Sequence, residues 1–212
     1  MAIKAPITLA IDTSAGTTVA LVSAGTVLAE HNIESNMSHA ESVGLAIASV
    51  LEAANLKAND VTEVVAGRGP APYTGLRVGL AAATMFAAGR ALPLYGVVSL
   101  DAIALAHFAQ EPTAEKRDGK PLLVTTDARR KEVFWAIYQA EPFARIEGPA
   151  VNTPAALEEI LGDRPIEITT AKISAEFIAK AADLIGVAKH EVSAIYLRAP
   201  DAVPSAGKKV SG

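Results

Sequence analysis

The stretch ITLAIDTSAGTTVALVSAGTVLAEHNI (residues 7–33) is the part of the sequence that most clearly predicts a fold. Residues 7–12 and 18–23 are apolar and rich in β-branched side chains. The turn residues 14–17 lie between them, which predicts a hairpin. Ala24-Gly25 forms a second turn into residues 26–33. We therefore expect three short strands in a meander, with Asp12 at the end of the first.

The same order of elements is predicted in both halves of the chain: a meander of three strands, a helix, a strand and a helix. A polar stretch with two prolines and a glycine (109–121) separates the halves and is typical of a linker. The expected strands are 61–66, 94–98, 121–127, 132–138, 143–147 and 165–169, and the expected helices are 39–54, 74–90, 99–109, one starting at 153–154, and 174–185.

This order predicts an α/β fold of two mixed-sheet units that face each other. We expect an N-terminal lobe over residues 1–108 and a C-terminal lobe over residues 109–212, with a flexible tail at 201–212. Ser38 with Glu41 resembles a capping box, Thr153 precedes Pro154 as a helix cap, and Gly186 follows the last helix as a stop.

Composition narrows the class of protein. The 212 residues carry a net charge of −4 and no extended basic run beyond Arg129-Arg130-Lys131, which does not favour tight nucleic-acid binding by the chain alone. There are no cysteines, so disulfides and thiolate chemistry are excluded. No apolar run approaches the length of a membrane span. The four histidines include no i, i+4 pair, so no metal site is predicted, and we expect a cytoplasmic protein.

The loop GRGPAPYTG (residues 67–75) has the glycines of a phosphate-binding loop but not its pattern. A P-loop lysine is missing, and Pro70 and Pro72 remove two backbone donors. A rigid turn into a helix, with Thr74 as cap, is therefore the favoured interpretation. The weaker alternative is an anion site, for which the candidate residues are Asp12, Thr13, Ser14 and Arg77.

A second turn mirrors the first. TDARRKEV places Asp127, Arg129 and Glu132 around the turn between two strands of the second half. A charged, solvated turn is the favoured interpretation, and anion contact by Arg129 is the weaker one.

The helices at 39–54 and 74–90 are apolar on nearly all sides. One side of each can pack on a sheet, and the other needs a cover, so two such helices side by side would present an exposed apolar patch. The alternative is that both helices belong to the core. The residues predicted for a partner interface are His39, Val43, Ile47, Val50, Leu76, Leu80, Thr84 and Met85.

Five segments occur in the order seen in a bacterial protein family: ITLAIDTSAGTTVALV, SHAESV, VVAGRGPAPYTGLRVGL, TTDARRKEVFWAIYQ and YLRAP. The chain resembles the TsaB family of threonylcarbamoyladenosine biosynthesis, often grouped with glycoprotease-like or M22 peptidase homologues, over about residues 7–200. The most specific piece is G-P-x-x-[FY]-T-G-L-R. Ala71 and Pro72 replace the usual Gly-Ser there, which weighs further against phosphate contact.

The resemblance implies two ribonuclease-H-like lobes of the actin/sugar-kinase/Hsp70 superfamily. It also implies a non-catalytic role, since the metal-binding H-x-x-x-H of the paralogue TsaD reads His39 and Val43 here. Such proteins pair with TsaD through the two N-lobe helices. With TsaE and ATP, the complex places threonylcarbamoyl on adenosine 37 of tRNAs that read ANN codons. This chain would need no cofactor of its own and would meet tRNA only through the complex.

Three functions remain in competition. The leading hypothesis is a partner subunit of TsaD that also forms a homodimer in isolation. The second is a nucleotide-dependent phosphotransferase of the sugar-kinase type, for which Asp12 is the motive. The third is an M22-type peptidase, which would need a nucleophile or metal that the sequence does not offer.

Overall fold

The computed structural model describes residues 5–33, 39–110, 119–185 and 192–198. The first half contains the strands β1 (Ile7–Asp12), β2 (Thr17–Ser23), β3 (Thr26–Ile33), β4 (Glu63–Gly67) and β5 (Leu94–Val97), the helices α1 (His39–Ala53), α2 (Tyr73–Ala88) and α3 (Ser99–Gln110), and a short 3₁₀ turn at Ala58–Asp60. The second half contains β6 (Leu122–Asp127), β7 (Val133–Gln139), β8 (Ala144–Asn152), β9 (Glu167–Thr169), α4 (Pro154–Leu161) and α5 (Ala175–Ile185).

Each half builds one mixed sheet, as predicted. The first has the order β3-β2-β1-β4-β5 and the second the order β8-β7-β6-β9. In both sheets the meander is antiparallel, and the next strand joins its first strand in parallel: β4 beside β1, and β9 beside β6. The carboxyl ends of β1 and β6 therefore hold equivalent places in the two sheets.

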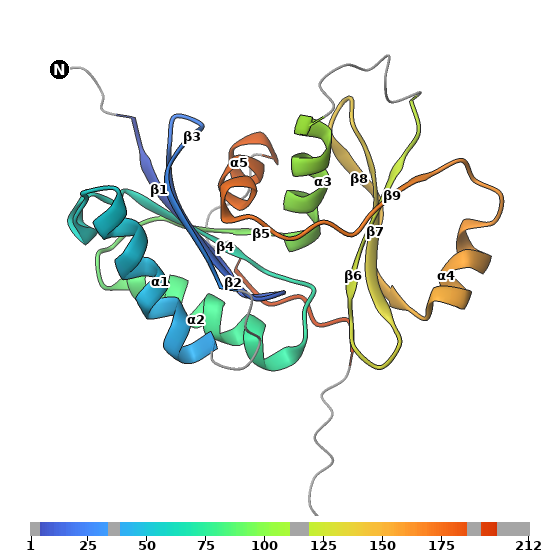
Figure 1. Cartoon of the computed structure of the whole chain (residues 1–212), viewed down its shortest axis with the longest axis horizontal. Helices are drawn as coiled ribbons and strands as arrows, with labels where there is room; N and C mark the ends of the chain where they lie inside the picture. The colour runs from blue at the N-terminus through green and yellow to red at the C-terminus, as the bar shows by residue number, and fades with distance from the viewer. Residues whose placement is uncertain (1–4, 34–38, 111–118, 186–191, 199–212) are drawn as a thin grey trace, which may run out of the picture.

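The elements form alternating layers (Figure 1). Helices α1 and α2 lie side by side on the outer face of the first sheet, α5 and α3 lie between the two sheets, and α4 covers the outer face of the second sheet. A helix layer packed between two sheets must be apolar on two sides, which explains why all but a few residues of α3 are buried.

The last helix does not cover the sheet of its own half. Ala175, Ile178, Ala179 and Ala181 of α5 pack on Ala10, Ala20, Val22, Val65 and Val97 of the first sheet. A division of the chain at residue 108 therefore separates the two sheets but groups α5 with the sheet that it does not cover. The small alanines on both sides allow this close approach.

A buried polar contact joins the layers. The Tyr138 hydroxyl on β7 donates a 2.7 Å hydrogen bond to the Asp101 carboxylate on α3, and Arg145 lies 3.6 Å from the same carboxylate oxygen. Burial raises the pKa of Asp101, while the charge of Arg145 acts in the opposite direction.

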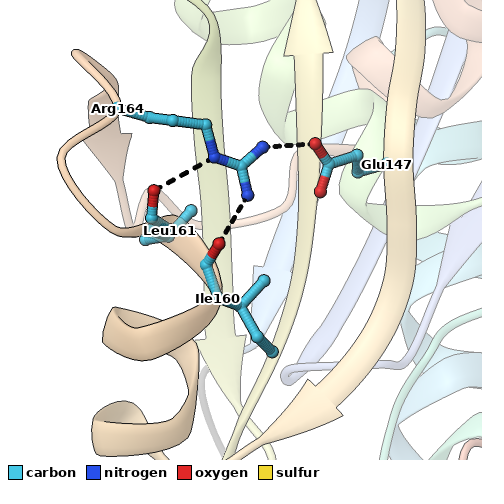
Figure 2. A network of polar contacts seen from close by, with 4 residues as sticks. All are labelled: Glu147, Ile160, Leu161 and Arg164. Carbon is cyan, nitrogen blue, oxygen red and sulfur yellow. Dashed lines mark hydrogen bonds and ion pairs between the residues drawn. The ribbon is translucent and has the colours of Figure 1, made fainter.

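The α4 helix is fixed at both ends. Its cap is as predicted, because the Thr153 side chain accepts a hydrogen bond from the Ala156 N–H. At the other end, the Arg164 guanidinium donates to the last carbonyls of Ile160 and Leu161 and pairs with Glu147 on β8 (Figure 2). Arg164 thus ties the end of α4 to the second sheet.

Two details differ from the sequence predictions, and three predicted features lie beyond the described residues. Thr74 does not cap α2, because the helix begins at Tyr73 and Pro72 holds the cap position. Strand β8 extends to Asn152, since it pairs with the whole of β7. The side chains of the proposed Ser38–Glu41 capping box, the proposed stop at Gly186 and the tail 201–212 lie outside the described residues.

Candidate functional site

The loop after β4 is fastened to the start of α3. Its Gly69-Pro70 peptide is cis, the Gly69 N–H donates to the Ser99 hydroxyl at 3.1 Å, and the Ser99 N–H donates to the Gly69 carbonyl at 2.8 Å. Because the amide of Gly69 is already bonded, and the prolines have none, this loop presents few donors to an anion. The prediction of a rigid turn into α2 agrees with this geometry.

Asp12 is buried under this loop, and both of its carboxylate oxygens accept hydrogen bonds. Its side chain is 1% exposed, accepts from the Ser14 N–H at 2.7 Å and accepts from the Ser99 hydroxyl at 2.5 Å. A Cβ on Gly67 would lie 1.7 Å from the carboxylate, so only glycine fits there. Burial raises the pKa of Asp12, and the hydrogen bonds from Ser99 and Ser14 partly oppose that rise.

Thr13 is built into the first turns of α2. Its hydroxyl donates to the Gly75 carbonyl at 2.8 Å and accepts from the Gly79 N–H at 3.0 Å. Gly75 and Gly79 are the pair that an α-helix normally joins directly, so the hydroxyl bridges one step of the helix ladder. A Cβ on Gly79 would lie 2.2 Å from that hydroxyl oxygen, which explains the glycine.

The four candidate anion contacts therefore separate. Asp12, Thr13 and Ser14 lie together, but the first two are buried, and Ser14 shares a 2.8 Å hydrogen bond with Ser99. Arg77 is exposed on α2 and contacts Tyr73 and Tyr196 instead. The structure thus gives the Asp12 turn an internal role: it positions the loop 67–72 and α2.

The predicted interface residues also separate. Val43, Val50 and Leu76 are at most 5% exposed and hold the helices to the sheet, so their assignment to an exposed face is wrong. Ile47 and Leu80 are half-buried, Thr84 and Met85 are exposed, and the side chain of His39 lies outside the described residues. A strong apolar signal selects core positions as readily as surface ones, because both stripes of these helices are apolar.

Apart from Thr84 and Met85, the exposed face of the helix pair consists of residues that the sequence analysis missed. It consists of Gly44, Leu45 and Ala48 on α1 and Ala81, Thr84, Met85 and Ala88 on α2, and we call it the docking face. Leu45 is 68% and Met85 is 73% exposed, and the exposed charged residues Glu52 and Arg77 follow at its ends. Helical periodicity could have identified these residues in the sequence, because they lie about one position along from the buried stripe of each helix and therefore face away from the sheet.

Gly44 on this face has no packing reason among the described residues. A Cβ there would meet nothing within 4 Å, and a glycine inside a helix costs about 1 kcal/mol relative to alanine. Since small residues allow a neighbouring helix to approach closely, the glycine fits a surface that another protein covers.

The second turn, at the end of β6, repeats the local geometry of the first in an exposed setting. Asp127 accepts from the Arg129 N–H at 2.7 Å, and its side chain is 64% exposed. The turn residues Arg129, Arg130 and Lys131 all have positive φ. A cavity of about 120 Å³ separates this turn from Tyr73 and Tyr196.

Among the described residues, no group of three or more histidine, aspartate or glutamate side chains is arranged to hold a metal ion. None of the helices in the described ranges is long and apolar enough to cross a membrane.

Comparison with known proteins gives the family. The family model described as "TsaD: tRNA N6-adenosine threonylcarbamoyltransferase" matches residues 26–195. An uncharacterised protein of Mycobacterium leprae is 35% identical over 93% of this chain and 56% of its own length. The tRNA threonylcarbamoyladenosine biosynthesis protein TsaB of Escherichia coli is 32% identical over 63% of this chain and 55% of its own length. The chain thus spans about half the length of the curated relatives it matches.

Solved structures agree on the fold. YeaZ from Pseudomonas aeruginosa, and a protein of that organism with similarity to peptidase YeaZ, superpose with TM-scores of 0.73 and 0.74 at 21% identity, covering 91% of this chain and all of theirs. The predicted fold of two mixed-sheet lobes flanked by helices is therefore confirmed. The chain belongs to the family that the TsaD model describes, and its named relatives within that family are TsaB proteins.

Proposed function

We propose that this chain is a non-catalytic subunit that docks on TsaD through the docking face and supports threonylcarbamoyladenosine formation on tRNA. The observation that carries the proposal is the exposed apolar surface of α1 and α2, on which Leu45 and Met85 are the most exposed large side chains. Relatives of the chain are named as threonylcarbamoyladenosine biosynthesis proteins, which supports a role in that reaction. ATP and TsaE would act in the same complex, and the chain would meet tRNA there.

Two residues of this chain support the proposal that it is non-catalytic. Val43, at the second position of the H-x-x-x-H pattern, has no ligand atom and packs in the core. Asp12, which a sugar-kinase-type mechanism would use, is enclosed by Ser14, Ser99 and Gly67. These placements support a partner role over a phosphotransferase or a peptidase.

The same apolar face would remain uncovered when the chain is alone. We therefore expect the isolated chain to form a homodimer through the docking face, and TsaD to displace one copy. Sedimentation of the isolated chain across a concentration range measures this directly.

The test uses Met85→Asp and Leu45→Asp. A buried apolar anchor at an interface typically contributes 2 kcal/mol or more, so each change should weaken TsaD binding about 30-fold. Isothermal titration of the full chain with TsaD measures the affinity, and thermal melting checks the fold. Leu80→Asp is less suitable, because Leu80 packs against the core.

Leu184→Asp is the matched control. Leu184 is 55% exposed and also lies on a helix, α5, away from the docking face. It should bind TsaD with wild-type affinity. If both docking-face variants bind TsaD as the control does, the proposed surface is refuted.

A further inference from the structure

Arginines and tyrosines from three distant segments meet beside the docking face. Tyr73 comes from the first turn of α2, Arg129 and Arg130 from the turn between β6 and β7, and Tyr196 and Arg198 from the segment 192–198. All five line the cavity of about 120 Å³. With Arg77, which contacts both tyrosines, they form a surface that we call the Tyr–Arg surface.

Arg77 is held in place without an opposite charge. Its Nε donates to the Tyr196 hydroxyl at 3.0 Å, a terminal nitrogen donates to the Tyr73 hydroxyl, and the guanidinium carbon lies 3.6 Å from the centre of the Tyr73 ring. No described carboxylate contacts it. A guanidinium has five N–H donors, so three remain for an external acceptor.

The two tyrosines lie against each other. Their ring centroids are 4.5 Å apart with the rings tilted by 33°, and Tyr196 is 38% exposed. An exposed tyrosine beside arginines suits single-stranded nucleic acid, since every base offers an aromatic face and every nucleotide a phosphate.

The neighbouring turn adds cations at a cost in backbone energy. Arg129, Arg130 and Lys131 have φ values of 62°, 54° and 61°, and a left-handed conformation costs about 1 kcal/mol or more for each non-glycine residue. Glycine would adopt it freely. Charged residues nonetheless occupy all three positions and are exposed.

The charge at this edge opposes that of the chain as a whole. Arg77, Arg129, Arg130 and Arg198 gather there, and the carboxylates of Asp127 and Glu132 pair with Arg129 and Arg198. The whole chain has a net charge of −4. A local cationic surface on an acidic protein is complementary to the phosphates of a nucleic acid.

We propose that the Tyr–Arg surface contacts the sugar–phosphate backbone and an unpaired base of the tRNA that the TsaD complex modifies. The inference rests on the proposed function and extends it from a docking subunit to one that shares in substrate binding. With so few phosphate contacts, binding by the chain alone would be weak at physiological salt. The contact would matter once TsaD holds the same tRNA.

The position of the surface suits this role. Arg77 and Met85 are eight residues apart on α2, which is about 12 Å along a helix. A protein docked around Met85 would therefore lie next to the Tyr–Arg surface. RNA bound to that protein could reach both.

The experiment measures tRNA binding by the assembled complex of the full chain and TsaD. Fluorescence anisotropy with a labelled, unmodified tRNA that reads an ANN codon is recorded between 50 and 200 mM salt. Arg77→Glu combined with Arg129→Glu should weaken binding at least 10-fold. The slope of log K against log salt should become shallower by about 1.4, since each lost phosphate contact on a single strand removes about 0.7. Tyr196→Ala should weaken binding 3-fold or more with little change in slope.

Arg90→Glu is the matched control, because Arg90 is exposed beyond the other end of α2 and lies over the Phe86 ring. It should change tRNA affinity less than 2-fold. All variants must bind TsaD with wild-type affinity. Wild-type tRNA affinity and slope in the double variant would overturn the inference while leaving the proposed function intact. Loss of TsaD binding in the double variant would also overturn it and assign the surface to the partner. A wild-type chain that does not bind TsaD would refute the proposed function itself.

Discussion

The turns after β1 and β6 have the same local design and opposite surroundings. In each, an aspartate accepts a 2.7 Å hydrogen bond from the N–H two residues later. Asp12 is 1% exposed and lies among Ser14, Ser99 and Gly67, whereas the Asp127 side chain is 64% exposed. The first turn therefore fastens α2 to the sheet, and the second is available at the surface. The two aspartates hold equivalent positions in the two lobes but have different roles, because only Asp12 is buried by the residues around it.

The largest difference in stability between the two turns is expected when the aspartate of each is replaced by alanine. Asp12→Ala leaves the Ser14 N–H and the Ser99 hydroxyl without their buried acceptor, which should cost about 2–3 kcal/mol of unfolding free energy. In Asp127→Ala the Arg129 N–H can bond to water instead, so the loss of unfolding free energy should be less than about 0.5 kcal/mol. Urea denaturation of both variants measures the two values. Equal losses would show that burial does not distinguish the turns.

A smaller loss is expected from Thr13→Val, which keeps the side-chain shape and removes the hydroxyl between Gly75 and Gly79. The lost bridge should cost about 1–2 kcal/mol. The Gly79 amide should also exchange with solvent faster, because its acceptor is gone, as hydrogen exchange can show. Thr84→Val is the control, since its hydroxyl bonds only to Leu80 within the same exposed stretch of helix. Unaltered Gly79 exchange in Thr13→Val would contradict the bridging role.

Asp12→Asn tests the buried carboxyl by pH. It should be milder than alanine, since the amide oxygen can still accept from the Ser14 N–H and the amide NH₂ can donate to the Ser99 hydroxyl oxygen. The pKa of Asp12 is raised above its ordinary value of 3.8, so the folded state binds the proton more tightly than the unfolded state. The wild-type chain should therefore lose stability relative to Asp12→Asn as pH rises from 3.8 through the raised pKa. Unfolding free energies of both proteins at several pH values measure this, and a difference independent of pH would argue against the raised pKa.

The smallest effect is expected from Arg130→Gly in the second turn. Glycine relieves the positive φ of 54° but gains freedom in the unfolded chain, so we expect a change between zero and about 1 kcal/mol of stabilisation. Thermal melting measures it. A clear destabilisation would mean that the Arg130 side chain contributes to the fold, and the contrast with the first turn would be weaker than stated.

The fold was largely predictable from the sequence, because alternating apolar stretches and turn residues report local structure directly. Both meanders, the helices and the Thr153 cap follow such local rules. The exposed side of the helix pair was only partly predictable. Of the residues predicted for a partner interface, Met85 and Thr84 are exposed, but Val43, Val50 and Leu76 are core residues. In helices that are apolar on every side, composition does not tell which side meets the sheet.

By itself, the sequence determined the repeated order of strands and helices, the stiff loop before α2 and the apolar character of the helix pair, since each depends on neighbouring residues. The tertiary structure alone decided three matters that depend on residues far apart in the chain. It buried Asp12 under Gly67 and Ser99, placed α5 on the sheet of the other half, and brought Tyr196 to Arg77 across 119 residues. Long-range packing sets exposure, and exposure decides whether a polar residue stabilises the fold or is free to bind.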